Sequence, residues 1–229
     1  MRVAGACQGG GVALIPQTRS ELAPGAVHVP GWLSRRQQRD LVGRCRDWSR
    51  APAGMRRKRM PRGGVMSVAQ VSLGWHWVPY RYSRTADDTD GAAVKPFPDD
   101  LGALGRAAVA AAYGHDGGYD PDIALINFYD VDARMGMHQD SDEKTDAPVV
   151  SLSLGDSCVF RFGNTDNRNR PWRDVTLESG DLFVFGGPSR LAFHGVPRVL
   201  AGTGPDDIGL DGGRLNITLR RSGLQAPRQ

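Results

Sequence analysis

Cysteine is scarce in this chain of 229 residues, which contains only Cys7, Cys45 and Cys158. An odd number of cysteines at these wide spacings, without a Cys-x-x-Cys pair, argues against a disulfide framework. Free thiols are typical of proteins in a reducing compartment, so we expect the protein to be cytoplasmic.

Long hydrophobic runs are absent as well. The longest apolar stretch lies around residues 107–113, and it is far shorter than the roughly 20 residues that a membrane-spanning helix needs. The first residues carry one arginine and a glycine-rich segment rather than a continuous apolar stretch. The sequence therefore predicts no signal peptide and no membrane partner.

Glycine and proline, in contrast, are plentiful, with 30 and 15 residues. Both favour turns, which indicates a fold of many short elements rather than a helical bundle. The length suffices for one substantial domain with a core, and a hydrophobic content of 40% is ordinary for a globular protein. We expect one globular unit and a monomer.

Positive charge exceeds negative charge by four at neutral pH, and it is concentrated in two basic groups. These groups are Arg56-Arg57-Lys58-Arg59 with Arg62, and Arg161, Arg168, Arg170 and Arg173. Basic patches attract polyanions such as nucleic acid. A solvated charged loop explains such a run equally well, so the charge alone does not identify a partner.

Helical periodicity occurs twice. Ser34 is a suitable N-cap, and the apolar residues after it recur at helical spacing as far as Trp48. A second periodic stretch covers residues 101–112 and ends near Gly114, which can terminate a helix. Before and between the helices, residues 1–33 are predicted as an extended lead-in and residues 51–64 as a loop.

Strand patterns dominate the rest of the chain. Residues 65–82 are rich in β-formers and aromatics, and after Gly118 short apolar runs alternate with turn residues. We predict strands over residues 123–129, 134–138, 148–154, 157–162, 173–178, 181–185, 191–195 and 214–221. About eight short strands at this spacing are typical of a sandwich or jelly roll. The predicted fold class is α+β, mainly β, with helices packed on a double-stranded β-helix (jelly-roll) core.

A candidate metal site consists of His138, Asp140 and His194. Residues two apart on a strand face the same side, so His138 and Asp140 can share one interior face. His194 lies 54 residues after Asp140, so only the fold can bring it close. Two imidazoles and one carboxylate suit Fe(II) and leave positions open for a cosubstrate and O₂. A His-x-Asp pair also arises by chance, and a lone histidine is more often structural, so other residues must decide.

The last predicted strand separates polar from apolar side chains. One face carries Arg214, Asn216, Thr218 and Arg220, and the other carries Leu215, Ile217 and Leu219. A surface sheet would turn the polar row to water. Arginine, however, is the residue best suited to bind a carboxylate through two parallel hydrogen bonds, so this row can also hold a dicarboxylate. Asn127 and Tyr129, two apart on another predicted strand, repeat the pattern.

Four longer segments carry a recognisable pattern: PDIALINFYDVDARMGMHQDSD (121–142), APVVSLSLG (147–155), GDLFVFGGPSRLAFHGV (180–196) and RLNITLRR (214–221). They resemble the AlkB family of Fe(II)- and 2-oxoglutarate-dependent DNA and RNA dealkylases, and most closely its bacterial type. MSVAQ (66–70), Gly74-Trp75 and Tyr80-Arg81-Tyr82 are similar to the nucleotide-recognition lid of that family. The resemblance covers roughly residues 62–222 in order.

The resemblance implies a role for each matching residue. The iron ligands would be His138, Asp140 and His194, and Arg220 would complete the catalytic group. The 2-oxoglutarate contacts would be Asn127, Tyr129, Arg214, Asn216, Thr218 and Arg220. The substrate contacts would be Trp75, Tyr80, Arg81, Tyr82, Asp142 and Arg168. Trp75 would stack on the flipped base opposite His138, Tyr80 and Tyr82 would touch the nucleic-acid backbone, and Asp142 would contact the base amino group and orient Arg220.

The lid departs from the family pattern, because it is about two residues shorter between its tryptophan and its tyrosines. Trp77 therefore competes with Trp75 for the stacking position. Without the resemblance, these aromatics would be interpreted as a small hydrophobic cluster under a loop. Phe185 stands where the family often has tryptophan before Gly-Gly. We expect these differences to affect the substrate preference more than the reaction that is catalysed.

The expected organisation is an N-terminal extension with the first helix (1–61), the lid (62–98), and a helix with the jelly-roll core (99–229). The implied activity is direct repair of N-alkylated bases such as 1-methyladenine and 3-methylcytosine, in DNA or RNA and preferably in single strands. Fe(II) would be the cofactor, 2-oxoglutarate and O₂ the cosubstrates, and formaldehyde, succinate and CO₂ the products. Two alternatives stay open: an oxygenase acting on a protein or small molecule, and a silent protein that binds alkylated nucleic acid.

Overall fold

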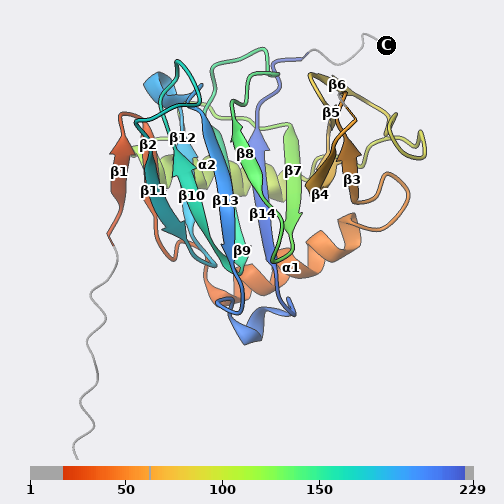
Figure 1. Ribbon diagram of the computed structural model, residues 1–229, viewed down its shortest axis with the longest axis horizontal. Coiled ribbons are helices and arrows are strands. Elements are labelled where there is room, and N and C mark those ends of the chain that lie inside the picture. Colours follow the sequence, from red (N-terminus) through yellow and green to blue (C-terminus); the bar gives the residue numbers. More distant parts are fainter. Residues whose placement is uncertain (1–17, 62, 225–229) are drawn as a thin grey trace, which may run out of the picture.

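A computed structural model describes residues 18–61 and 63–224, and two β-sheets form its centre (Figure 1). The strands of the major sheet are β1 (Ser20–Ala23), β2 (Ala26–Val29), β3 (Arg56–Arg59), β4 (Val65–Leu73), β7 (Ile123–Tyr129), β9 (Val149–Gly155), β12 (Leu182–Phe185) and β14 (Arg214–Arg220). They lie in the order β1-β2-β12-β9-β14-β7-β4-β3.

The minor sheet contains β8 (Met135–His138), β10 (Ser157–Phe162), β11 (Arg173–Leu177) and β13 (His194–Leu200), in the order β11-β10-β13-β8. Buried aromatic residues from both sheets pack between them: Phe160, Phe162, Phe183 and Phe185. Two facing sheets of this kind confirm the predicted jelly-roll core. A separate hairpin, β5 (His76–Val78) and β6 (Arg81–Ser83), lies beside β4 in Figure 1.

Both α-helices cover the outer face of the major sheet, as expected. Helix α1 (Arg35–Trp48) begins at Ser34, whose side chain accepts from the backbone of Gln37 while the Gln37 side chain accepts from the backbone of Ser34. Helix α2 (Asp99–Tyr113) ends at Gly114, which adopts a left-handed conformation (φ 82°) that favours glycine. The apolar faces of the helices and of the major sheet form one core.

The alternation in β14 separates two environments. Leu215, Ile217 and Leu219 belong to the core beneath the helices. The polar row is buried too, because it faces the space between the two sheets rather than water. The solvent-facing interpretation of this row is therefore wrong, and its side chains need partners inside the barrel.

Three predicted boundaries are wrong, each because distant residues supply the pairing. The predicted lead-in contains β1 and β2, where β2 pairs with β12. The predicted loop 51–64 contains β3, because the edge of β4 offers hydrogen bonds to a segment of low strand propensity. The strand predicted over 191–195 begins only at His194 and continues to Leu200.

Cys7 and Arg62 lie outside the described residues. The division into segments 1–61, 62–98 and 99–229 stays a prediction, and each of the three contributes strands to the major sheet. Among the helices that the structure describes, none is long and apolar enough to cross a membrane.

Candidate active site

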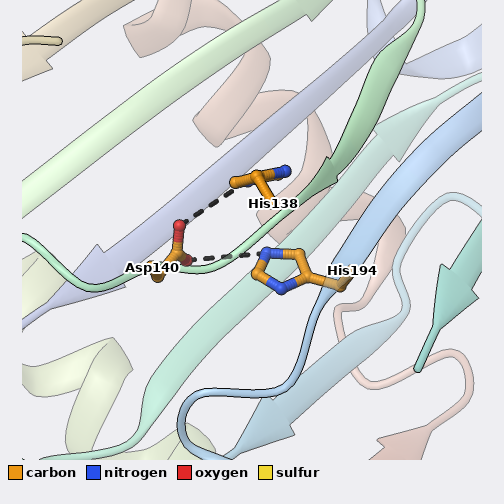
Figure 2. A group of neighbouring side chains, drawn as sticks. All are labelled: His138, Asp140 and His194. Carbon is orange, nitrogen blue, oxygen red and sulfur yellow. Dashed lines mark ion pairs between the residues drawn. The ribbon is translucent and has the colours of Figure 1, made fainter. Parts of the chain in front are cut away.

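Three potential metal ligands meet at the β8 edge of the minor sheet. His138 is the last residue of β8, Asp140 follows just beyond it, and His194 opens β13 directly opposite His138. Asp140 Oδ1 lies 3.6 Å from His138 Nε2, and Asp140 Oδ2 lies 3.7 Å from His194 Nε2 (Figure 2). One ligand atom from each residue lies within 4.8 Å of the other two. This arrangement can converge on a single metal ion.

The close approach of β8 and β13 at the site requires glycine at position 195. A Cβ atom there would lie 2.7 Å from the backbone oxygen of Met135. The ladder also shifts register between His194 and Val196. Gly195 thus lets β13 bring His194 against His138 without a steric clash.

Backbone carbonyls fix the orientation of both imidazoles. His138 Nδ1 lies 2.9 Å from the oxygen of Gly136, and His194 Nδ1 lies 3.0 Å from the oxygen of Ala192. A carbonyl oxygen only accepts, so each Nδ1 carries the proton. In the neutral form of each ring, Nε2 is then unprotonated and lies toward Asp140, which is the form that binds a metal.

The protonation states of the buried ligands also suit a cation. Burial raises the pKa of Asp140, but Arg220 and the two histidines outweigh it and lower the pKa to about 2. Burial and the neighbouring His138 lower the pKa of His194 to about 4. Near neutral pH the site therefore holds an ionised carboxylate and a neutral His194 imidazole.

All nine residues predicted for iron and 2-oxoglutarate line one cleft: Asn127, Tyr129, His138, Asp140, His194, Arg214, Asn216, Thr218 and Arg220. Arg214 is 1% exposed and donates from Nη2 to Ser153 Oγ at 2.9 Å. Its Nε and Nη1 atoms have no hydrogen-bond partner within the described part of the chain. A buried guanidinium with unused donors is suited to an anionic partner such as a carboxylate.

Sequence reasoning missed Gln70, which holds part of this cleft in place. The Gln70 side chain on β4 donates from Nε2 to Asn127 Oδ1 at 2.8 Å. Gln70 and Asn127 are direct partners across the β4–β7 pair. Gln70 is the fifth residue of the MSVAQ segment (66–70), but only the pairing register reveals what it contacts.

Glu143 is the second missed residue, and it links two arginines beneath the metal ligands. Arg220 contacts Asp140 Oδ1 at 2.7 Å and Glu143 Oε1 at 3.0 Å. Arg190 contacts Glu143 Oε2 at 2.9 Å and donates to the backbone oxygen of Asp140 at 2.6 Å. The expectation that Asp142 orients Arg220 is therefore wrong, because Glu143 and Asp140 occupy that position. The adjacent carboxylates in the sequence gave no means of choosing between them.

We expect Glu143→Gln to destabilise the fold by roughly 3–5 kcal/mol, because it leaves buried Arg190 without its carboxylate partner and leaves Arg220 with Asp140 alone. Burial raises the pKa of Glu143, but Arg220 and the donated hydrogen bonds outweigh it, so the pKa falls below its ordinary 4.5. The ionised folded form thus contributes stability above about pH 4.5, and this contribution is lost as the pH falls through the lowered value. Urea unfolding between pH 3 and 7 measures the difference.

The exposed Glu178 provides a control, since Glu178→Gln should change the free energy of unfolding by no more than about 0.5 kcal/mol. Equal effects of the two substitutions would contradict a special role for Glu143.

The lid tryptophans are not placed as the resemblance implies. Trp75 is 8% exposed, packs on Ile123 and Leu125, and donates from Nε1 to Asp122 at 3.1 Å. Trp77 instead lines a second cleft, which adjoins the first and shares His138, Asp140 and Arg220 with it. The assignment of Trp75 to the base-facing position is therefore wrong in geometry, because Trp75 is turned into a small hydrophobic core.

The other predicted substrate residues differ in position. Asp142 lines the second cleft and accepts from Trp77 Nε1 at 2.7 Å. Tyr80 is 75% exposed at the tip of the β5–β6 hairpin. Arg81 is exposed beside Asp87, and Arg168 is exposed near the ring of Phe193. Tyr82 turns inward and donates to Glu143, so a contact between its hydroxyl and a nucleic-acid backbone is not supported.

The basic run 56–59 is only partly exposed. This contradicts both a fully solvated loop and a continuous basic surface that binds the phosphates of a nucleic acid. Arg56 forms an ion pair with Asp88 at 2.8 Å, and Lys58 is fully buried. Arg57 and Arg59 alternate with them on the outer side of β3. Pairing with β4 turns every second residue of the run inward.

The residues present fit the groups that the site implies. His138, Asp140 and His194 would hold Fe(II), a metal suited to two nitrogens and one carboxylate oxygen. The unused donors of buried Arg214 would hold a carboxylate of 2-oxoglutarate in the same cleft.

Comparison with known proteins agrees with this geometry. Residues 25–220 match the model of the 2OG-Fe(II) oxygenase superfamily. The alpha-ketoglutarate-dependent dioxygenase AlkB homolog of Caulobacter vibrioides is 40% identical over 207 residues, covering 88% of this chain and 89% of that protein. Alpha-ketoglutarate-dependent dioxygenase AlkB of Escherichia coli is 38% identical over 169 residues, covering 71% and 75%.

Longer relatives match as well. DNA N(6)-methyladenine demethylase ALKBH1D of Arabidopsis thaliana is 32% identical over 221 residues, and this chain spans half the length of that protein. The solved structure of OsALKBH1 superposes with a TM-score of 0.80 at 33% identity, covering 89% of this chain and all of the other. The chain therefore belongs to the 2OG-Fe(II) oxygenase superfamily and, within it, to the AlkB family.

Proposed function

We propose that this protein is a nucleic-acid dealkylase, which uses Fe(II), 2-oxoglutarate and O₂ to remove alkyl groups from bases such as 1-methyladenine and 3-methylcytosine. The observation that carries the proposal is the junction of two clefts. The first contains the metal ligands with Arg214, and the second contains Trp77 and Asp142. A flat base beside Trp77 would present its edge toward His138 and Asp140.

The activities named for the relatives support this assignment. The Caulobacter and Escherichia proteins are alpha-ketoglutarate-dependent dioxygenases. The human relative, 32% identical over 180 residues, is a nucleic acid dioxygenase.

When bound, iron with 2-oxoglutarate would supply the oxidation that hydroxylates the N-alkyl carbon, so that a methyl group leaves as formaldehyde beside succinate and CO₂. The chain supplies position and charge. Arg220 keeps Asp140 ionised, and the carbonyls of Gly136 and Ala192 aim both imidazoles. Asp142 retains one carboxylate oxygen beyond the bond from Trp77, which would accept from the amino group of the base.

Access to the reactive edge requires an unpaired base, because alkylation at these positions lies on the Watson–Crick edge. Extruding a base from a duplex costs a few kcal/mol and is cheapest where a lesion already prevents pairing. Single strands avoid most of that cost, so we propose that they are the preferred substrate. The monomeric state and the cytoplasmic location likewise stay predictions.

We expect Trp77→Ala to weaken binding of a methylated oligonucleotide by about 1–3 kcal/mol, roughly 5- to 150-fold in Kd, because it removes the stacking surface. Trp75→Ala should leave Kd within about threefold but destabilise the fold by roughly 3–5 kcal/mol, because it empties a packed site. Fluorescence anisotropy with a labelled single strand, paired with urea unfolding, checks both. The reverse order would restore Trp75 as the base-facing residue.

The function is tested by mass spectrometry of single-stranded oligonucleotides that contain 1-methyladenine or 3-methylcytosine. The protein is incubated with Fe(II), ascorbate and 2-oxoglutarate. The expected result is the loss of one methyl group, dependent on both iron and 2-oxoglutarate. A parallel oligonucleotide with N6-methyladenine addresses the activity named for the Arabidopsis relative.

The other outcomes separate the alternatives. Succinate formation without any loss of methyl groups would keep the oxygenase and refute the nucleic-acid substrate. Neither product, from a folded and iron-loaded sample, would favour a silent binding protein.

A further inference from the structure

Lys58 occupies an unusual position in this fold. It lies on the edge strand β3 in a run of four basic residues, yet only 1% of its surface is exposed. Its Nζ atom has no hydrogen-bond partner among the residues that the structure describes. An unpaired ammonium at such a position is costly, because burial removes its hydration without replacing it.

The surroundings of Lys58 connect it to the proposed base-binding cleft. Nζ lies 4.3 Å from the centroid of the Trp77 ring. Trp77 lines the cleft together with His138 and Asp142, whereas Lys58 does not border it. Trp77 thus contacts Lys58 and borders the cleft, so any effect of Lys58 on a bound base would pass through the indole ring.

The charged groups around Lys58 disfavour a second positive charge. Arg56 on β3 and Arg220 on β14 are both cationic neighbours. Asp88, in the segment after β6, is the anionic one, but it already contacts Arg56 at 2.8 Å and His76 on β5 at 2.6 Å. Burial, followed by Arg56, lowers the pKa of Lys58 to about 6. Near pH 7.5 the amine is therefore mainly uncharged.

We propose that Lys58 is a positioning residue of the lid: its uncharged amine packs against the Trp77 ring and supports it beside the cleft, whereas an ammonium there would draw on the electron density of the ring face. The inference rests on the proposed function, because it concerns which alkylated bases that cleft selects.

A base alkylated at N1 of adenine or N3 of cytosine is cationic at neutral pH. A cation binds an aromatic face through the electron density of the ring. An uncharged amine behind Trp77 leaves that density to the base, whereas an ammonium would compete for it from the other side. The arrangement therefore favours cationic alkylated bases over neutral ones, and this preference declines as the pH falls below about 6.

The titration of Lys58 beside Trp77 is tested first, without catalysis. The full chain is labelled with 5-fluorotryptophan, and the Trp77 resonance is assigned by its absence in Trp77→Phe. Between pH 8 and 5 the wild-type resonance should shift with a midpoint near pH 6. Lys58→Met, which is unbranched and uncharged, should show no such transition. The same transition in both proteins, or in neither, would refute the role of Lys58.

Selectivity is tested with two isomeric single strands, one containing 1-methyladenine and one N6-methyladenine. At pH 7.5 wild type and Lys58→Met should prefer the cationic isomer by the same ratio of Kd values, within about twofold. Lys58→Arg, which keeps a charge behind the ring, should reduce that ratio by roughly 3- to 30-fold. At pH 5.5 wild type should resemble Lys58→Arg, and Lys58→Met should not. An unchanged ratio of Kd values in Lys58→Arg would overturn the proposed effect of Lys58 on selectivity.

Stability gives a third readout that does not depend on any substrate. Lysine in the unfolded chain titrates near 10.5 and Lys58 in the fold near 6, so the unfolded state binds more protons between these values. Wild-type stability should rise with pH across this window, and Lys58→Met should lack that slope and unfold several degrees higher at pH 7. Lys144→Met, at an exposed lysine, is the control and should keep the slope.

The tests separate this inference from the proposed function. A wild-type protein that demethylates neither isomer would refute the dealkylase, while the fluorine titration would still decide the role of Lys58. Demethylation with identical fluorine titrations in wild type and Lys58→Met would refute only the inference.

Discussion

His138→Ala is expected to lower kcat for a methylated oligonucleotide by about a thousandfold or more, because the metal would keep only one histidine and one carboxylate. The His138 side chain is 37% exposed, so its removal leaves no buried cavity and the fold should persist. Succinate release and formaldehyde release, measured together at saturating iron, report the loss. Retained turnover would exclude His138 from the ligand set.

Two comparisons sharpen this prediction. His115→Ala, at an exposed histidine just beyond α2, should leave kcat within about twofold, since exposed surface changes have small effects. Asp140→Asn should also abolish turnover, but with a cost in stability, because Asp140 is buried and paired with Arg220 at 2.7 Å. Of these three variants, only His138→Ala is therefore expected to lose turnover while remaining about as stable as wild type.

Arg214→Ala is expected to raise the KM for 2-oxoglutarate by roughly 30-fold or more, since truncating one partner of a buried charge pair costs about 2–5 kcal/mol. Arg214 contacts Ser153 rather than a metal ligand, so kcat at saturating 2-oxoglutarate should fall much less. Without 2-oxoglutarate, the variant should unfold no earlier than wild type, because two guanidinium nitrogens of Arg214 have no partner among the described residues. Steady-state kinetics and thermal unfolding, each with and without 2-oxoglutarate, measure these effects.

Arg220→Ala distinguishes the two arginines of β14. Arg220 contacts Asp140 and Glu143, so its loss should lower both kcat and stability as well as raise the KM. Arg173→Ala, at an exposed arginine on β11, is the control for a general loss of positive charge. An unchanged KM in Arg214→Ala would mean that the polar row of β14 is structural and that 2-oxoglutarate binds elsewhere.

The sequence by itself determined much of this protein, because several patterns have a purely local cause. The alternation over residues 214–220 requires one apolar and one polar face, since side chains alternate along a strand. Ser34 with Gln37 and the glycine at position 114 determine where the helices begin and end. The spacing of His138 and Asp140 already places both on one side of the chain, and the segments shared with AlkB proteins predicted the family.

Only the tertiary structure decided what covers each face. The polar row of β14 is enclosed by the minor sheet, and His194 reaches the site because β13 pairs with β8. Glu143 rather than Asp142 pairs with Arg220, and Trp77 rather than Trp75 lines the second cleft. Lys58 is buried because β3 pairs with β4, which turns its side chain toward Trp77. A local pattern determines which direction a side chain takes, but its partners come from strands far away in the chain, and their pairing depends on the whole fold.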